Sequence, residues 1–337
     1  MLTRFTILGD GAWGTTIALL LSRRDDQEVT LWSARPDYGQ HLQNTRENTA
    51  FLPGVRIPEA IRLTSDIRLA LARPDLVISA IPTIYLRQSL MRLAGDLGPN
   101  VPVLSLSKGI ENETFQLPSA IIRELLGTKR IAVLSGPSHA EEVSRGLPAT
   151  VVVASRDLDL SREIQAHLSD DRFRVYTNLD VIGVEIAGAL KNILGLAGGI
   201  CDGLGLGDNA KSALLTRGLV EIARFGVAQG GSHHTFFGLA GLGDVITTCV
   251  STHGRNRNVG ERLAKGEKLS AILGSMSMVA EGVFTTRSVH EKAQLLGLVM
   301  PITAEVYRVM YEDKDPRQAV RDLMQREPPS EGPGFEV

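Results

Sequence analysis

The chain has few cysteines and almost no net charge, and each absence narrows what the protein can be. Only Cys201 and Cys249 occur among 337 residues, and neither has a nearby cysteine or a partner at metal-ligand spacing. The histidines His233, His234 and His253 also lack such spacing. We therefore expect neither a disulfide framework nor a metal site, and a reducing compartment fits. The formal net charge of −2 excludes a broad basic surface for nucleic acid, so an anionic ligand must meet a local cluster of donors.

A signal peptide and a convincing membrane span are also missing from the sequence pattern. The N-terminus enters a strand-like run at once. The apolar run at residues 181–200 is rich in glycine and interrupted by Glu185 and Lys191, which argues against a span. The composition, 43% hydrophobic and 22% charged, is ordinary for a soluble protein with a sizeable core. We expect a cytoplasmic protein.

Strand and helix patterns alternate in the first half of the chain. The strand-like runs are residues 4–8, 28–32, 76–81, 101–106, 131–134, 150–154 and 172–178. This alternation predicts an α/β domain over residues 1–178, built on a Rossmann-type, doubly wound parallel sheet. Clear strand signals then stop, so residues 179–325 are predicted to form an all-α domain and residues 326–337 a disordered tail.

The first strand-like run leads into the glycines of a dinucleotide-binding motif. Gly9, Gly11 and Gly14 form the pattern G-x-G-x-x-G between a strand and a helix. The first glycine permits a tight turn, the second lets the backbone approach a pyrophosphate, and the third lets the helix pack on the strand. The setting favours dinucleotide binding; a glycine-rich turn without a ligand is the alternative.

The second strand-like run ends in Ser33, Ala34 and Arg35, not in the acidic residue typical of an NAD-selective site. A hydroxyl and a cation suit a 2′-phosphate better, so we expect a modest preference for NADP. Arg35 could equally be a solvated loop arginine. Phe51, in the loop after the next helix, could cover a nicotinamide or simply cap the core.

Two later strand ends carry groups that could bind a ligand. Lys108 follows the run at residues 101–106, and Gly136 and Ser138 follow the run at residues 131–134. Ligands of doubly wound sheets lie beyond the carboxyl ends of the strands, which makes these residues candidates. Ordinary turn chemistry would explain each segment equally well.

The apolar helical run at residues 181–200 contains Lys191, a charged residue that is unusual in such a segment. On helical spacing Gly188 and Gly195 lie at i−3 and i+4 from Lys191, so its ammonium emerges from a face with little side-chain bulk. We interpret these small residues as clearance for a cofactor and a substrate beside the amine. The alternative is a core helix whose lysine reaches the rim.

A further candidate region follows in the second half of the chain. Asp244 comes after a glycine triplet, and Gly254 is followed by Arg255 and Asn256. Backbone N–H groups after Gly254, together with the paired donors of Arg255, predict a phosphate site at a helix start. A basic helix start on the surface is the alternative.

Taken in order, these segments resemble the bacterial NAD(P)-dependent glycerol-3-phosphate dehydrogenases over nearly the whole chain. The matching stretches are GDGAWGTT, LSKGIE, SGPSHAEEV, GALKNILGLAGGICDGLGLGDNAKSALLTRGL, GLAGLGDVITTC, HGRNRNVG and VAEGV. The resemblance implies reversible reduction of dihydroxyacetone phosphate to sn-glycerol 3-phosphate with NADPH or NADH, feeding glycerophospholipid synthesis. It also implies a second domain like the C-terminal domain of 6-phosphogluconate dehydrogenase, and a homodimer without nucleic-acid or integral membrane contacts.

The resemblance assigns roles to residues by matching motif. Lys191 is the expected general acid in reduction and general base in oxidation. The matching substrate positions are Gly136, Ser138, Asp244, Gly254, Arg255 and Asn256, with Lys108 between cofactor and substrate. The matching cofactor positions are Ala12, Trp13, Ala140, Arg255, Val279 and Glu281, beside the three motif glycines, Arg35 and Phe51.

Two departures from the family pattern bear on the cofactor. Relatives often have Trp-Ala-Arg-Arg at the end of the second strand, where this chain has a single Arg35, which leaves the strength of the NADP preference open. Asp10 stands where many relatives have a small residue, and a carboxylate beside a pyrophosphate is unfavourable unless it points away.

Two other functions stay open: a related dehydrogenase, such as a β-hydroxyacid dehydrogenase or ketopantoate reductase, and a sensing module that binds NADPH without turnover.

Overall fold

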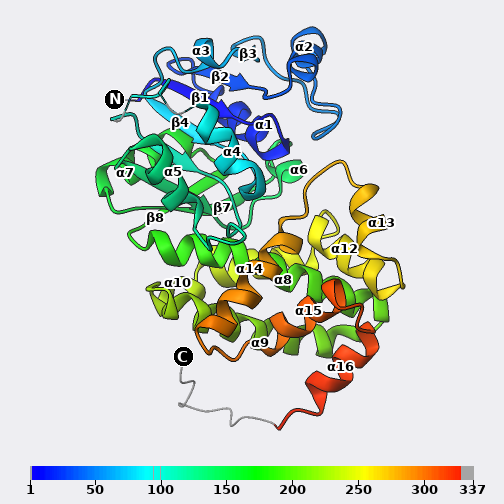
Figure 1. The fold of residues 1–337 in the computed structure, drawn as a ribbon. Coiled ribbons are helices and arrows are strands. Elements are labelled where there is room, and N and C mark those ends of the chain that lie inside the picture. The colour runs from blue at the N-terminus through cyan, green and yellow to red at the C-terminus, as the bar shows by residue number, and fades with distance from the viewer. Residues whose placement is uncertain (1, 94, 99, 328–337) are drawn as a thin grey trace. The chain divides into compact units, whose positions relative to one another are not determined.

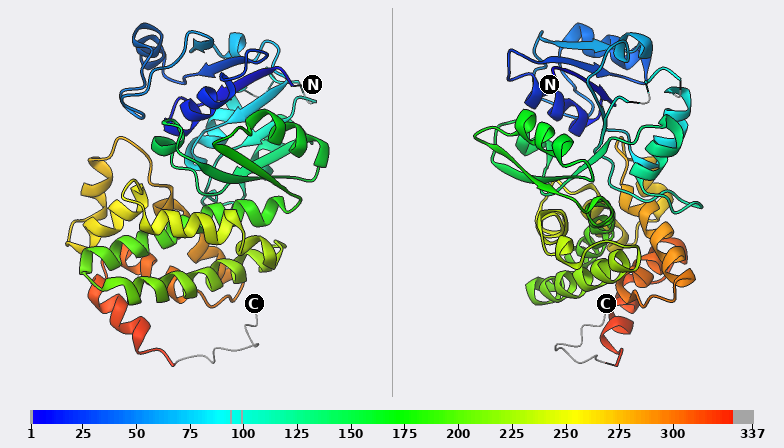
Figure 2. Two further views of the ribbon diagram at one scale, coloured as in Figure 1. Left: turned by 180° about the vertical axis from the view of Figure 1, so that it is seen from behind. Right: turned by 90° about the vertical axis from the view of Figure 1, so that its left-hand side faces the viewer.

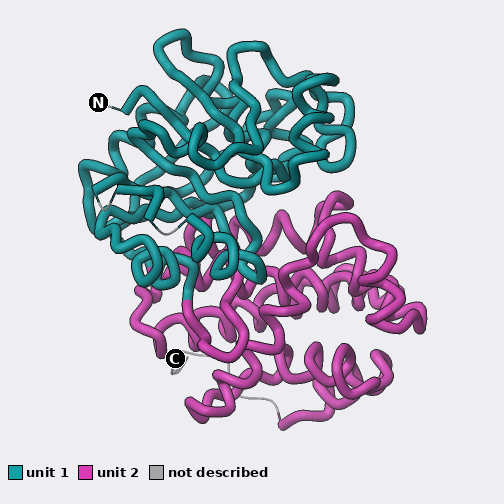
Figure 3. The backbone as a smooth tube through the Cα atoms, turned by 45° about the horizontal axis from the view of Figure 1, so that its top comes forward, with its two compact units in different colours: residues 1–108, 117–181 teal, residues 109–116, 182–337 magenta. Residues whose placement is uncertain are grey.

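The computed structural model describes residues 2–93, 95–98 and 100–327, and the chain divides into two compact units, coloured in Figure 3. Unit 1 consists of residues 1–108 and 117–181, and unit 2 of residues 109–116 and 182–337. Of the expected disordered tail, residues 328–337 lie outside the described part of the chain.

Unit 1 is built on an eight-stranded sheet (Figure 1). The strands are β1 (Arg4–Leu8), β2 (Glu28–Trp32), β3 (Ile61–Thr64), β4 (Leu76–Ser79), β5 (Val103–Ser105), β6 (Ile131–Ser135), β7 (Ala149–Ser155) and β8 (Phe173–Asn178). Their order is β3-β2-β1-β4-β5-β6-β7-β8, and the strand order reverses between β1 and β4. This topology confirms the doubly wound α/β prediction. A ligand is therefore expected to bind at the carboxyl end of β1.

Two strands differ from the sequence-based expectation. The pattern does not predict β3, because it has only four residues and Arg62 interrupts its apolar side chains. The sheet was also expected to be parallel throughout, but β7 runs antiparallel to β6. The connection between them contains only the one-turn helix α6 (Ala140–Val143), which is too short to carry the chain back along the sheet.

Helices cover both faces of the sheet (Figure 2). Ile7 of β1 lies in a buried cluster with Ile17 and Ile164, whereas the next residue, Leu8, lies in a second cluster with Leu90. The helices of unit 1 are α1 (Ala12–Leu21), α2 (Pro36–Thr45), α3 (Ile67–Ala70), α4 (Thr83–Leu93), α5 (Pro118–Leu126), α6 and α7 (Leu158–Leu168). Because both faces are covered, the strand ends are the part of the sheet that a ligand can reach.

The described residues of unit 2 form helices joined by turns and loops, without strands, which confirms the all-α prediction. Its helices are α8 (Val181–Leu204), α9 (Gly207–Ala228), α10 (His233–Phe236), the π-helical turn η1 (Leu239–Gly243), α11 (Asp244–Val250), α12 (Arg255–Ala264), α13 (Leu269–Gly274), α14 (Glu281–Leu295), α15 (Pro301–Tyr311) and α16 (Pro316–Met324). Glycine-rich sequence and turns separate several of them, so the chain folds back repeatedly.

The glycine-rich helix α8 is the buried axis of unit 2. By length and composition it could cross a membrane, but 89% of its most apolar window is buried inside the protein. A Cβ atom at Gly199 would lie 2.0 Å from the carbonyl oxygen of Arg257, and one at Gly260 would lie 2.0 Å from the carbonyl oxygen of Leu196. The backbones of α8 and α12 therefore touch, and only glycine fits at these two positions.

Candidate active site

The loop between β1 and α1 has the geometry of a pyrophosphate site. Gly9 has φ +114°, and a Cβ atom there would lie 3.0 Å from the carbonyl oxygen of Ala80. A Cβ atom at Gly14 would lie 2.0 Å from the carbonyl oxygen of Gly9, whereas one at Gly11 would meet no atom within 4 Å. Gly9 and Gly14 thus close the turn, and Gly11 faces open space. The first turn of α1 has no acidic side chain, so its N–H groups and dipole favour an anion there.

Ala12 and Trp13 open α1 and bring backbone groups, not side chains, to this loop. Both side chains pack against the core of unit 1, and the Trp13 ring lies 6.3 Å from the ring of Phe173. Thr16 of α1 donates a hydrogen bond to the carbonyl oxygen of Ala140 at 3.4 Å. Ala140, another expected cofactor position, therefore lies beside the helix that begins at the glycine loop.

The Asp10 side chain points to the end of β2. Its Oδ2 atom accepts a hydrogen bond from the Ser33 hydroxyl at 2.6 Å and lies 3.7 Å from Nη2 of Arg35. The residue is buried. The carboxylate that would be unfavourable beside a pyrophosphate is therefore engaged with the strand end and partly balanced by a cation.

Arg35 lies against two aromatic rings at the same strand end. Its Cζ atom is 4.5 Å from the ring centroid of Tyr38 and 5.1 Å from that of Phe51. Such cation–π contacts orient the guanidinium, while 54% of the side chain stays exposed and within reach of a ligand. Phe51 thus supports Arg35, a role that the sequence did not indicate.

Asn48 is a structural element of this region that sequence reasoning missed. Its side-chain amide donates hydrogen bonds to the carbonyl oxygen of Asp10 at 2.8 Å and to the Thr15 hydroxyl at 2.7 Å. Its Oδ1 atom accepts from the Tyr38 hydroxyl at 2.7 Å. Asn48 is fully buried, so it ties the glycine loop to α2. No local pattern signals this role, because the partners come from distant parts of the sequence.

Three of the predicted substrate positions lie together at the ends of β5 and β6. Lys108 Nζ donates to the carbonyl oxygen of Gly136 at 3.1 Å, and the Ser138 hydroxyl donates to the same oxygen at 2.9 Å. Gly136 has φ +125°, and a Cβ atom there would lie 3.0 Å from the Cα atom of Val151. Two segments that could each have been ordinary turns therefore form one cluster that holds an ammonium and a hydroxyl.

In unit 2, Lys191 of α8 is buried against two polar groups of α11. Its Nζ atom lies 2.8 Å from Asp244 Oδ1 and donates to the Thr248 hydroxyl at 2.8 Å. Lys191 is 9% exposed and Asp244 is 2% exposed. The alternative of a lysine that reaches the rim is therefore wrong. A buried ammonium with its counter-ion and a hydroxyl suits proton transfer.

Thr248 is a second residue that sequence reasoning missed. It follows Asp244 by four residues in α11, so both side chains lie on one face of the helix. That spacing is the signal that could have identified it. The π-helical turn η1 stands directly before Asp244, a local feature that recurs at functional sites.

The sequence predicts open space for a ligand beside Lys191, and at Gly195 this prediction is wrong. A Cβ atom at Gly195 would lie 2.7 Å from Cγ2 of Thr248 and 3.2 Å from Cβ of Asn256. Side chains of α11 and α12 fill the space. The glycine therefore lets these two helices approach the lysine and leaves no room for a ligand at that point.

The expected phosphate site at the start of α12 is braced by the chain that leads into α14. Gly254 precedes α12, whose first turn has no acidic side chain. Arg255 is exposed and donates from Nη1 to the carbonyl oxygen of Val279 at 2.9 Å, two residues before Glu281 begins α14. A helix start with an adjacent, oriented guanidinium suits a phosphate group.

The next two residues of α12 serve the protein's own structure. Asn256 donates to Oδ1 of Asn192 at 2.9 Å and accepts from the N–H of Gly282 at 3.0 Å. Arg257 forms ion pairs with Asp202 at 2.6 Å and with Glu261 at 2.7 Å. Asn256 therefore joins α12 to α14 and to the residue after Lys191, while Arg255 stays exposed at the helix start.

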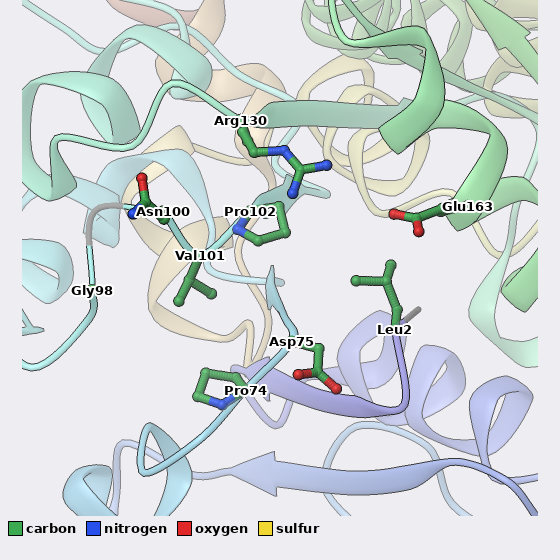
Figure 4. Close-up of a pocket in the computed structure, with 9 residues that line it drawn as sticks. All are labelled: Leu2, Pro74, Asp75, Gly98, Asn100, Val101, Pro102, Arg130 and Glu163. Carbon is green, nitrogen blue, oxygen red and sulfur yellow. The ribbon is translucent and has the colours of Figure 1, made fainter.

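A cavity of about 440 Å³ lies at the amino ends of the strands in unit 1 (Figure 4). Of its lining residues, Asp75 and Arg130 stand directly before β4 and β6, and Leu2 lies two residues before β1. Arg4 pairs with Asp75 at 2.6 Å and holds the pKa of that carboxyl well below its usual range, and Arg130 pairs with Asp157. The Asp75 and Arg130 charges that line the cavity are therefore paired within the protein.

The cysteines and possible metal ligands add no further site. Cys201 and Cys249 are both buried thiols, and burial raises the pKa of Cys249 to about 12. A thiol of this kind is a poor nucleophile at neutral pH. Among residues 2–93, 95–98 and 100–327, no group of three or more His, Cys, Asp or Glu side chains could hold a metal ion.

Known proteins resemble the chain along almost its whole length. Residues 4–161 match the model of the NAD-dependent glycerol-3-phosphate dehydrogenase N-terminus, and residues 180–321 match that of the C-terminus. A glycerol-3-phosphate dehydrogenase (NAD(P)+) from Prosthecochloris aestuarii is 46% identical over 329 residues, which cover 97% of this chain and 99% of the relative. One from Moorella thermoacetica is 48% identical over 320 residues, 95% of each protein.

Solved structures also resemble the chain. The crystal structure of glycerol-3-phosphate dehydrogenase from Coxiella burnetii has a TM-score of 0.92 and 37% identity, covering 96% of this chain and 99% of that one. A ketopantoate reductase from Ralstonia eutropha has a TM-score of 0.60 and 16% identity, covering 96% and 100%. The second likeness concerns the fold alone.

Proposed function

The chain belongs to the NAD-dependent glycerol-3-phosphate dehydrogenase family, and we propose that Lys191 is the general acid and base of its reaction. The enzyme reduces dihydroxyacetone phosphate to sn-glycerol 3-phosphate reversibly, with NADPH or NADH. The observation that carries the proposal for Lys191 is its burial against Asp244 and Thr248, each at 2.8 Å.

Reduction of a ketone requires a proton at the oxygen, because negative charge develops there. When bound, the nicotinamide supplies the hydride and takes it back in oxidation. The Lys191 ammonium donates the proton to that oxygen, and the resulting amine accepts it again in the reverse direction. Asp244 balances the charge of the buried ammonium, and Thr248 orients it. A positioned acid of this kind contributes roughly 10²- to 10⁴-fold to the rate.

The substrate phosphate is assigned to the start of α12. The N–H groups after Gly254 offer hydrogen bonds and a favourable dipole, and Arg255 offers two parallel donors. The contact of Arg255 with Val279 supports this role, because it orients the guanidinium before a ligand arrives. Asn256 keeps the helix start beside the residue that follows Lys191.

Unit 1 supplies the dinucleotide site in this proposal. The open side of Gly11 and the first N–H groups of α1, at Ala12 and Trp13, receive the pyrophosphate. The cluster of Lys108, Gly136 and Ser138 is assigned to the polar groups of the substrate and the nicotinamide half of the cofactor. We accordingly keep residues 1–178 as the dinucleotide-binding domain and residues 179–325 as the catalytic domain.

The setting of the enzyme is also a proposal. We infer from the family resemblance that the chain is a cytoplasmic homodimer without integral membrane contact and that its product feeds glycerophospholipid synthesis. Light scattering should give twice the mass of one chain, and cell fractionation should recover the enzyme without detergent. A monomer, or recovery with the membranes only, would contradict the corresponding part.

The activity is tested by following cofactor oxidation with dihydroxyacetone phosphate, using NADPH and NADH in parallel. Unphosphorylated dihydroxyacetone and ketopantoate are the comparison substrates. We expect turnover that depends on the phosphate group, because Arg255 and the α12 start recognise it. Preference for an unphosphorylated ketone would favour a related dehydrogenase, and cofactor binding without oxidation would favour a sensing module.

A further inference from the structure

The end of the second strand is where doubly wound enzymes choose between their two nicotinamide cofactors. An NAD-selective site usually carries an acidic residue there, which accepts hydrogen bonds from the ribose hydroxyls. In this chain β2 is followed by Ser33, Ala34 and Arg35, so no acidic residue stands at the carboxyl end of the strand. The Asp10 carboxylate reaches the same place from the glycine loop, 2.6 Å from the Ser33 hydroxyl.

Asp10 is held in this position through its backbone as well as its side chain. The N–H of Gly9 donates to the carbonyl oxygen of Trp32 at 3.1 Å, which joins the glycine loop to the end of β2. Asn48 donates to the carbonyl oxygen of Asp10 at 2.8 Å. The Asp10 side chain is only 12% exposed. Turning the carboxylate away would therefore break a buried hydrogen bond.

Arg35 is the group at this strand end that attracts a 2′-phosphate. Tyr38 and Phe51 orient it, and more than half of its side chain is exposed. Asp10 lies 3.7 Å from the same guanidinium, so it partly balances the charge that the phosphate would need. A carboxylate at this distance also repels the phosphate directly. The Asp10 carboxylate and the Arg35 guanidinium thus lie together where the ribose carries a 2′-hydroxyl in NADH and a 2′-phosphate in NADPH.

From this geometry we propose that Asp10 is a specificity-determining residue that moves the preference of the enzyme from NADPH toward NADH. Facing a ribose 2′-hydroxyl, the carboxylate accepts a hydrogen bond; facing a 2′-phosphate, it opposes two negative charges. Asp10 thereby takes the place of the acidic residue that is missing at the carboxyl end of β2, and it counteracts Arg35. The inference rests on the proposed function, and it revises the NADP preference that Arg35 alone predicts.

The variant Asp10→Asn tests the charge, because asparagine keeps the size and an acceptor oxygen for Ser33. NADPH and NADH are titrated into the full-length enzyme, and each Kd is measured by cofactor fluorescence without substrate. The values of kcat/KM with dihydroxyacetone phosphate are then measured with both cofactors. We expect the ratio of affinities to shift toward NADPH by about tenfold or more in Asp10→Asn. Arg35→Ala should shift it in the opposite direction.

Asp37→Asn is the matched control, because it removes an equal charge at an exposed position in the first turn of α2. If Asp10→Asn does not fold, judged by thermal unfolding, Asp10→Ser is the second variant, since serine is shorter and uncharged. An unchanged cofactor ratio in the folded Asp10 variant, or an equal shift in Asp37→Asn, would overturn the proposal. Because binding is read without turnover, a failure to reduce dihydroxyacetone phosphate would contradict the proposed function alone.

Discussion

Removing Asp244 would leave the Lys191 ammonium buried without its counter-ion. The two charges lie 2.8 Å apart, and their side chains are 2% and 11% exposed. At an effective dielectric constant of about 20, this separation corresponds to an attraction of about 6 kcal/mol. Water near the partly exposed lysine offsets some of the loss, so we expect Asp244→Ala to lower the free energy of unfolding by about 3–5 kcal/mol.

The double variant Lys191→Met, Asp244→Ala separates this charge effect from simple loss of packing. It removes both charges of the pair, so it should be more stable than Asp244→Ala alone. Urea unfolding at neutral pH, followed by circular dichroism, measures the wild type, both single variants and the double variant. Glu291→Ala is the control, because it breaks the more exposed Arg287–Glu291 pair, and it should cost less than about 1 kcal/mol.

Two results would contradict this expectation. In one, Asp244→Ala lowers the free energy of unfolding by no more than Glu291→Ala does; in the other, the double variant is less stable than the Asp244 single variant. Either result would mean that the Lys191 ammonium is not dependent on Asp244 inside the protein.

Two other predictions concern the phosphate site and a buried carboxyl group. Arg255→Ala should raise the KM for dihydroxyacetone phosphate about ten- to hundredfold at saturating cofactor, since a charged hydrogen bond contributes about 1.5–3 kcal/mol. Arg262→Ala, further along α12, is the control. An unchanged KM in Arg255→Ala would place the phosphate elsewhere. Glu221 accepts hydrogen bonds from the N–H groups of Ile302 and Thr303, yet burial raises its pKa from 4.5 to about 7. Folding therefore favours its protonated form, and its contribution to stability should fall by about 3 kcal/mol as the pH rises from 4.5 to 7. Glu221→Gln should remove this slope in urea titrations at several pH values, and an equal slope in both proteins would contradict the assignment.

Features determined by local sequence were predictable. The spacing of Gly9, Gly11 and Gly14 between a strand and a helix predicts a tight turn, and in the structure Gly9 and Gly14 close that turn. Likewise, Gly254 before Arg255 predicts a helix start with open N–H groups, and α12 begins there. In both cases the physical cause lies within a few residues of the site.

Features that depend on contacts between distant segments could not be predicted. The direction of the Asp10 side chain depends on Ser33, 23 residues away, and the role of Asn48 depends on partners in the glycine loop and α2. The purpose of Gly195 was misjudged for the same reason, because α11 and α12 fill the space beside it. A helical pattern shows which face is bare, but not which neighbour covers it.

The turnover of Lys191→Met with dihydroxyacetone phosphate tests most directly whether Lys191 transfers the proton. The Kd of NADH is measured in the same preparation, and Lys211→Met, which breaks an ion pair with Asp202 in the same unit, is the matched control. We expect the kcat of Lys191→Met to be lower by roughly 10²- to 10⁴-fold, with the Kd of NADH within about twofold of the wild type. A kcat within about tenfold of the wild type in a folded Lys191→Met enzyme would contradict this role of Lys191.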